Sequence, residues 1–196
     1  MGKIVSALVC GAGFLGLSTQ PCLAQAPAAY PVPVPALPAP LAPLAVEQPA
    51  YTTLVLELDV KRPARQVWAR IGKFCDLGEW MGMPCKITQG DDFKLGSVRV
   101  LGNGIVEMLV SKTELSYTYA QPVRVGVPYN AYHGSLEVRP TGRKTSRLVY
   151  SFFYDTSMLA DDAARARESA ARKARFNAAM ANMKLLAEGG QLPPAR

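Results

Sequence analysis

The sequence predicts an α+β fold: a curved antiparallel sheet of about seven strands wrapped around a long C-terminal helix, with two short helices after the first strand. Three observations lead to this prediction. Segments of alternating polar and apolar residues recur between turn signals, as in antiparallel strands. Apolar residues at helical spacing follow the first of these segments. Finally, residues 159–188 contain no proline or glycine and are rich in alanine, arginine and lysine, which favours one long helix.

The first strand is expected at 51–60, because its apolar residues occupy alternate positions. These residues are Leu54, Leu56, Leu58 and Val60. Pro63 suits a helix start, and apolar side chains at helical spacing follow it. They are Val67, Trp68, Ile71 and Phe74. Residues 76–81 are predicted to form the second short helix.

Six more strands are expected, at about 85–89, 97–102, 104–112, 115–121, 130–139 and 146–155. Glycine, proline and aspartate separate most of them, and Gly102-Asn103-Gly104 suits a tight hairpin turn. The long helix should begin near Asp161-Asp162, where the helix dipole favours acids, and end at Gly189-Gly190. This helix is expected to cover the concave face of the sheet, and one stripe of it contains Phe176, Met180, Met183 and Ala187. Phe176, Met180 and Met183 are expected to form a movable roof, with ordinary core packing of an amphipathic helix as the alternative.

The chain before the domain has the pattern of an export signal. Lys3 precedes an apolar run from Ile4 to Leu17, and Ala24-Gln25-Ala26 is a cleavage signal, so residues 1–26 are predicted to be a signal peptide. A membrane anchor is the alternative. Residues 27–50 hold eight prolines and should form an extended linker, or a ligand for a proline-recognising partner. A ligand-binding domain at 51–190 and a tail at 191–196 complete the chain, which we expect in the periplasm or outside the cell.

The net charge and the cysteines limit which ligands, partners and compartment are expected for this protein. Loss of Lys3 lowers the formal net charge from +7 to about +6, and much of the excess lies in the last helix, so nucleic-acid binding is not expected. The charge supports at most a weak attraction for anionic ligands or a transient contact with a membrane surface. In an oxidising compartment Cys75 and Cys85 should form a disulfide, with two free buried thiols as the alternative. No metal site or cofactor is expected, and the only histidine, His133, should face outward.

A charged residue interrupts each apolar run of the predicted hairpin at 97–112. Arg99 stands in the first run and Glu107 in the second. A hairpin that lines a cavity has this pattern, because a cavity needs apolar walls and a few polar groups. Alternatively, Arg99 and Glu107 form a cross-strand pair that stabilises the hairpin by under about 1 kcal/mol.

Several short motifs, taken in order, carry a family likeness. They are Pro63 followed by Val67-Trp68 and Ile71-Gly72-Lys73-Phe74, then Trp80, Gly96-Ser97-Val98-Arg99, Glu107-Met108-Leu109, Tyr117-Thr118-Tyr119 and Asn130-Ala131-Tyr132. The chain resembles the START/Bet v 1-like superfamily of helix-grip proteins, and within it the polyketide cyclase/dehydrase and lipid-transport group. The later motifs resemble the plant abscisic-acid receptors, although the turn at 102–104 is too short to be their gate loop. The likeness covers about 54–155 and, more loosely, the last helix.

The resemblance implies a cavity for a hydrophobic or amphipathic small molecule between the sheet and the last helix. Lys86 falls near the family's anion-pairing lysine, and Glu107 and Tyr132 match polar cavity positions of the receptors. Strand alternation adds inward aromatic residues as candidate walls, or as ordinary core packing. The full set of candidate ligand-binding residues is Lys86, Arg99, Glu107, Tyr117, Tyr119, Tyr132, Tyr150, Phe152, Phe176 and Met180.

Three functions remain open from the sequence. The first is an exported carrier of a hydrophobic small molecule or lipid, because no nucleophile, base and orienting acid stand in a recognisable pattern. The second is an enzyme of cyclase or dehydratase type, in which the tyrosines and Arg99 polarise a carbonyl and Glu107 acts as acid or base. The third is an interaction module whose cavity is filled by its own side chains.

Overall fold

The computed structural model describes residues 48–102, 104–122 and 129–193. The predicted signal peptide lies outside the described residues, as does the linker apart from residues 48–50. None of the helices in the described part of the chain is long and apolar enough to cross a membrane.

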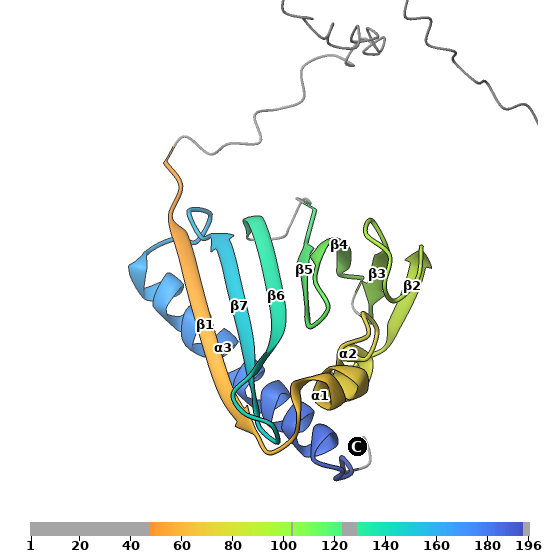
Figure 1. Ribbon diagram of the computed structural model, residues 1–196. Coiled ribbons are helices and arrows are strands. Elements are labelled where there is room, and N and C mark those ends of the chain that lie inside the picture. Colours follow the sequence, from red (N-terminus) through yellow and green to blue (C-terminus); the bar gives the residue numbers. More distant parts are fainter. Residues whose placement is uncertain (1–47, 103, 123–128, 194–196) are drawn as a thin grey trace, which may run out of the picture. The chain divides into compact units, whose positions relative to one another are not determined.

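A seven-stranded antiparallel sheet forms the body of the domain, in the order β1-β7-β6-β5-β4-β3-β2 (Figure 1). Its strands are β1 (Tyr51–Val60), β2 (Cys85–Gln89), β3 (Val98–Leu101), β4 (Val106–Lys112), β5 (Ser116–Ala120), β6 (Asn130–Pro140) and β7 (Ser146–Asp155). Each expected strand is present close to its predicted limits, because alternation and turn residues are local signals. The chain enters at one edge of the sheet, and the remaining strands follow in sequence from the other edge inward.

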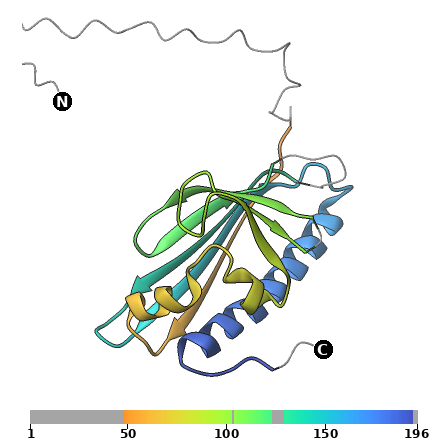
Figure 2. The same ribbon diagram turned by 90° about the vertical axis from the view of Figure 1, so that its right-hand side faces the viewer.

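The described residues also form three helices: α1 (Ala64–Ile71), α2 (Leu77–Met81) and α3 (Asp162–Ala187). The α3 helix begins as expected, with the Asp161 side chain accepting a hydrogen bond of 2.6 Å from the Ala164 amide. The sheet curves over α3, which runs along its concave face (Figure 2). The prediction of a helix-grip α+β fold is therefore confirmed.

The core fills most of the space between sheet and helices. Inward side chains of β1, β5, β6 and β7 meet the stripe of α3 that contains Phe176, Met180 and Met183, all of them buried. Trp80 of α2 is fully buried and packs edge-on against Tyr150. His133 has the opposite parity from Tyr132 on β6 and is only partly buried, as its predicted outward position requires.

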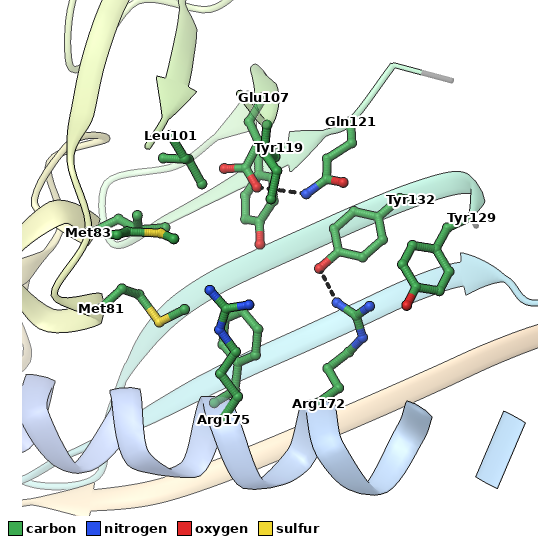
Figure 3. A pocket seen from close by; sticks show the side chains of 13 residues that line it. Met81, Met83, Leu101, Glu107, Tyr119, Gln121, Tyr129, Tyr132, Arg172 and Arg175 are labelled. Carbon is green, nitrogen blue, oxygen red and sulfur yellow. Dashed lines mark hydrogen bonds between the residues drawn. The ribbon is translucent and has the colours of Figure 1, made fainter. Parts of the chain in front are cut away.

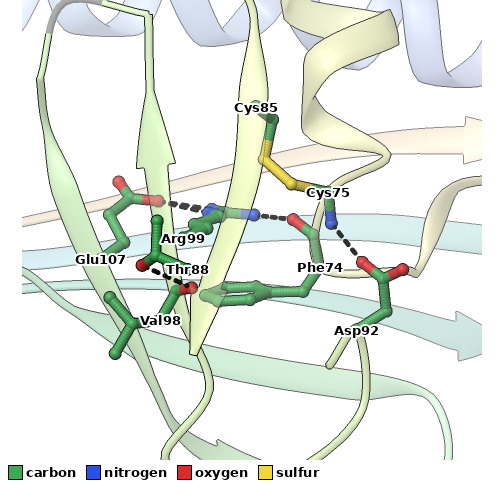
Figure 4. The surroundings of a disulfide bond; sticks show 8 residues. All are labelled: Phe74, Cys75, Cys85, Thr88, Asp92, Val98, Arg99 and Glu107. Atoms are coloured by element: carbon green, nitrogen blue, oxygen red, sulfur yellow. Dashed lines mark hydrogen bonds and ion pairs between the residues drawn. A yellow bond between two sulfur atoms is a disulfide. The ribbon is translucent and has the colours of Figure 1, made fainter. Parts of the chain in front are cut away.

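Cys75 and Cys85 form a disulfide, with their Cα atoms 5.6 Å apart, so the predicted bridge is confirmed (Figure 4). It joins the segment between α1 and α2 to the first residue of β2. The Cys75 amide also donates a hydrogen bond of 2.9 Å to the Asp92 carboxylate. By the chain-entropy argument, closing so short a loop stabilises the fold by about 2–3 kcal/mol.

Candidate functional site

A cavity of about 210 Å³ remains open between α3, α2 and the inward faces of β3, β4 and β5 (Figure 3). It is lined by Leu77, Met81, Met83, Leu101, Ile105, Glu107, Tyr119, Gln121, Tyr129, Tyr132, Arg172, Arg175 and Phe176. Most of this lining is apolar or aromatic, and a few polar groups interrupt it. Binding sites for small organic molecules have this composition.

Glu107 supplies the carboxylate on the cavity wall. It stands directly opposite Arg99 in the β3–β4 ladder, because a short turn joins the two strands. Arg99 Nε donates to Glu107 Oε2 over 2.7 Å, and Gln121 Nε2 donates to Glu107 Oε1 over 2.9 Å. Both carboxylate oxygens therefore have a partner.

Arg99 lies behind this carboxylate and is fully buried. Its Nη1 donates to the carbonyl oxygen of Phe74, and its guanidinium carbon lies 4.0 Å from the centre of the Phe74 ring (Figure 4). The cross-strand pair is thus confirmed, but it is buried and not on the surface. The estimate of under about 1 kcal/mol holds for exposed pairs. Removing one partner of a buried pair costs about 3–5 kcal/mol.

A second polar cluster lies at the α3 side of the cavity, around Arg172. Its Nη1 donates to the Tyr132 hydroxyl over 2.7 Å, and its Nε donates to Glu168 Oε1 over 2.8 Å. The same carboxylate accepts hydrogen bonds from the hydroxyls of Tyr129, at 3.0 Å, and Tyr154, at 2.7 Å. The Arg172 guanidinium also lies against several aromatic rings, the nearest being that of Tyr154 at 4.6 Å. Arg172 is therefore fixed in the cavity wall by Tyr132 and Glu168.

The tyrosine hydroxyls of the wall are neutral at physiological pH. Burial raises the pKa of Tyr132 to about 12, although the charge of Arg172 opposes this shift. Burial, reinforced by Tyr132, raises the pKa of Tyr119 well above its ordinary value. The hydroxyl groups of Tyr119 and Tyr150 form a hydrogen bond of 3.0 Å with each other. These groups can offer hydrogen bonds to a ligand but are poor proton acceptors near neutral pH.

Arg175, one turn from Arg172, is directed from α3 toward the cavity (Figure 3). No residue in the described part of the chain forms a hydrogen bond or ion pair with its guanidinium. An adjoining hollow of about 240 Å³ shares Tyr129, Arg172, Arg175 and Phe176 with the first. Arg175 therefore lies where the two hollows meet.

The structure brings four of the predicted binding residues to this cavity. They are Glu107, Tyr119, Tyr132 and Phe176. Tyr150, Phe152 and Met180 are buried in the adjacent core, and Arg99 lies behind Glu107. Tyr117 lines a different hollow of about 250 Å³ beside Trp68. Two inward residues of the same strand, Tyr117 and Tyr119, thus face separate spaces.

Lys86 is not brought to the cavity. On β2 the alternation places Cys85 and Ile87 in half-buried positions and leaves Lys86 exposed on the other face. Lys86 instead lines a separate hollow beside Thr88 and Val100. The cations that line the cavity are Arg172 and Arg175 of α3.

Sequence reasoning missed Arg172 and Arg175. The spacing of the α3 stripe contained a signal for Arg172, because the step of four from Met180 to Phe176 continues to Arg172 and then to Glu168. No such signal exists for Arg175. Gln121 and Tyr129 flank a proline-containing segment and belong to no alternating pattern.

The fold and the cavity define a helix-grip protein of the ligand-binding SRPBCC type. A family described as polyketide cyclase/dehydrase and lipid transport matches residues 52–188, and the chain belongs to it. The expected family is thus confirmed. Its members include cyclases and lipid transporters, and they generally bind hydrophobic small molecules or lipids.

Solved structures share the fold at low sequence identity. A solution NMR structure from Thermobifida fusca is 23% identical, with a TM-score of 0.60 over 72% of this chain and 97% of the other. A protein of Nitrosospira multiformis is 19% identical, with a TM-score of 0.55 over 68% and 94%. Norcoclaurine synthase from Thalictrum flavum is 13% identical, with a TM-score of 0.56 over 75% and 99%. No curated protein matches the chain significantly.

Proposed function

We propose that this protein is an exported carrier that holds a hydrophobic or amphipathic small molecule between the sheet and α3. The observation that carries the proposal is the cavity of about 210 Å³, with its apolar and aromatic walls and few polar groups. An apolar molecule that enters it leaves water, and each buried CH₂ group contributes about 0.8 kcal/mol. The family description, which includes lipid transport, supports the same function.

The state of the polar wall groups favours a carrier over a cyclase or dehydratase. Arg99 and Gln121 each donate to one carboxylate oxygen of Glu107, which suits a fixed hydrogen-bond acceptor in the cavity wall. Tyr119 and Tyr132 remain protonated near neutral pH, because burial raises both pKa values. General acid–base catalysis works best with a pKa near the working pH. These side chains are better suited to orienting a bound molecule.

The open space itself argues against a domain whose interior is filled by its own side chains. Protein cores are packed to crystal-like density, and they rarely retain voids much larger than a water molecule. The hollow of about 210 Å³ is partly open to solvent, and its lining side chains leave room for a ligand.

Export rests on the N-terminal signal pattern and on the bridged cysteines. A disulfide that links Cys75 to Cys85 is stable in an oxidising compartment and rare in a reducing one. Intact-mass analysis of protein from its native host tests this part of the proposal. A mature chain that lacks residues 1–26 supports export, and a full-length reduced chain contradicts it.

Native mass spectrometry of the purified protein tests the carrier function. We expect a copurified small molecule in the wild type and its loss in Ile105→Trp, because the larger ring would occupy the cavity. Ile105 is only half-buried, so the fold should tolerate the change. Val110→Trp, on the exposed face of β4, is the matched control and should retain the molecule. Absence of any bound molecule, together with no binding of the apolar dye N-phenyl-1-naphthylamine, contradicts the proposal.

A further inference from the structure

Gly134 occupies an unusual place for a glycine, inside β6, which lies between β5 and β7 in the sheet. It is buried on the inward face, as are Tyr132 and Leu136 on either side of it. Glycine weakens the interior of a strand, because it loses much backbone freedom on folding and has no side chain to pack. Its φ is not positive, so the backbone conformation does not require glycine here. The reason must therefore lie in the space around it.

The ring of Tyr119 fills that space. Tyr119 on β5 is the direct cross-strand partner of Gly134. A Cβ atom added at Gly134 would lie 2.7 Å from Cε1 of Tyr119 and still closer to Cζ and the hydroxyl oxygen. Carbon atoms in contact are normally about 3.5–4.0 Å apart. The end of the ring thus lies over Gly134, and from there its hydroxyl reaches that of Tyr150 on β7, at 3.0 Å.

This position of the ring against the sheet keeps the cavity open. Tyr119 lines the cavity, whereas Gly134 does not (Figure 3). Neighbouring groups limit where the ring can go, since the Arg99 guanidinium carbon lies 4.9 Å from its centre and the centre of the Tyr132 ring lies 6.4 Å away. A side chain at position 134 would push the ring away from the sheet and into the open space of the cavity.

We propose that Gly134 is a positioning residue that sets the depth of the ligand cavity, because it lets Tyr119 lie against the sheet. The inference rests on the proposed binding function and adds what limits the size of the ligand. Gly134 acts through Tyr119 and not by contact with the ligand. A larger residue at position 134 would raise the ring, and the cavity would then accept only smaller molecules.

The test compares a large and a small apolar probe, N-phenyl-1-naphthylamine and indole, in titrations of the full chain. We expect Gly134→Ala to weaken binding of the large probe about tenfold and to leave indole binding nearly unchanged. Partial unfolding would weaken both, so the ratio of the two affinities reports on the cavity alone. The matched control is Gly142→Ala, between β6 and β7, where an added Cβ meets only the hydroxyl of the exposed Thr145. It should keep the wild-type ratio.

A double variant shows whether Tyr119 is the cause. Leucine lacks the Cε1, Cζ and hydroxyl atoms that an added methyl group at Gly134 would meet. The variant Gly134→Ala/Tyr119→Leu should therefore fold and bind both probes as Tyr119→Leu does, even if Gly134→Ala alone does not fold. Such non-additive behaviour is expected of two residues in direct contact.

The outcomes separate this inference from the function on which it rests. An unchanged ratio of affinities in Gly134→Ala overturns the inference and leaves the carrier function intact. A double variant that does not fold, or that binds the large probe more weakly than Tyr119→Leu, also overturns it. Binding of neither probe by the wild type overturns the inference, and together with the absence of a copurified molecule it overturns the carrier function as well.

Discussion

The buried pair between Arg99 and Glu107 provides the sharpest test of the structure. In Glu107→Leu the guanidinium of Arg99 stays charged and loses its counter-ion in the interior. The side chains of Arg99 and Glu107 are 0% and 3% exposed, so solvent cannot replace the lost carboxylate fully. Removing one partner of such a pair costs about 3–5 kcal/mol. We expect the lower part of this range, because Glu107 borders a cavity that can hold water.

The assay is urea unfolding of the oxidised protein at neutral pH. The matched control is Glu79→Leu, which breaks an ion pair with Arg70 of the same 2.6 Å separation but with side chains 40% and 47% exposed. This change should lower the free energy of unfolding by less than about 1 kcal/mol. The double variant Arg99→Met/Glu107→Leu should be more stable than Glu107→Leu, because it no longer buries an unpaired charge. Equal small losses at Glu107 and Glu79 would refute the reasoning.

Three further predictions concern the bridge, the alkaline stability and the roof of the cavity. The variant Cys75→Ala/Cys85→Ala should lower the free energy of unfolding by about 2–3 kcal/mol, and non-reducing peptide mapping of the wild type should find no alkylatable thiol at either position. Folding raises the pKa of Tyr132 from its ordinary value of 10.0 to about 12. The protonated Tyr132 hydroxyl therefore stabilises the fold fully below pH 10.0, and this stabilisation is lost as the pH rises toward 12. The free energy of unfolding should therefore fall less steeply over this window in Tyr132→Phe than in the wild type, and identical slopes would contradict the shift. In hydrogen exchange, α3 should exchange faster than β7 and slow down when ligand binds, whereas equal protection with and without ligand would leave α3 a packing role alone.

The sequence by itself determined the order of the elements and the inward face of each strand. Both depend on patterns within a few residues: alternation in strands, steps of three and four in helices, and glycine or proline at turns. The pairing of Arg99 with Glu107 was accessible for the same reason, since a short turn sets the register of the two strands. The bridge between Cys75 and Cys85 followed from the compartment that the N-terminal residues indicate.

Only the tertiary structure decided where the interior stays open. Tyr117 and Tyr119 have the same parity on β5, yet they face different hollows, because the side chains of other elements fill the space between them. Arg172 and Arg175 belong to a segment whose composition indicates no more than a helix, and they reach the cavity through the position of α3 along the sheet. That position depends on how Phe176 and its neighbours fit against residues far away in the chain. A pattern within a few residues does not depend on such long-range packing and cannot predict it. The side chains that line the cavity could therefore be identified only from the folded structure.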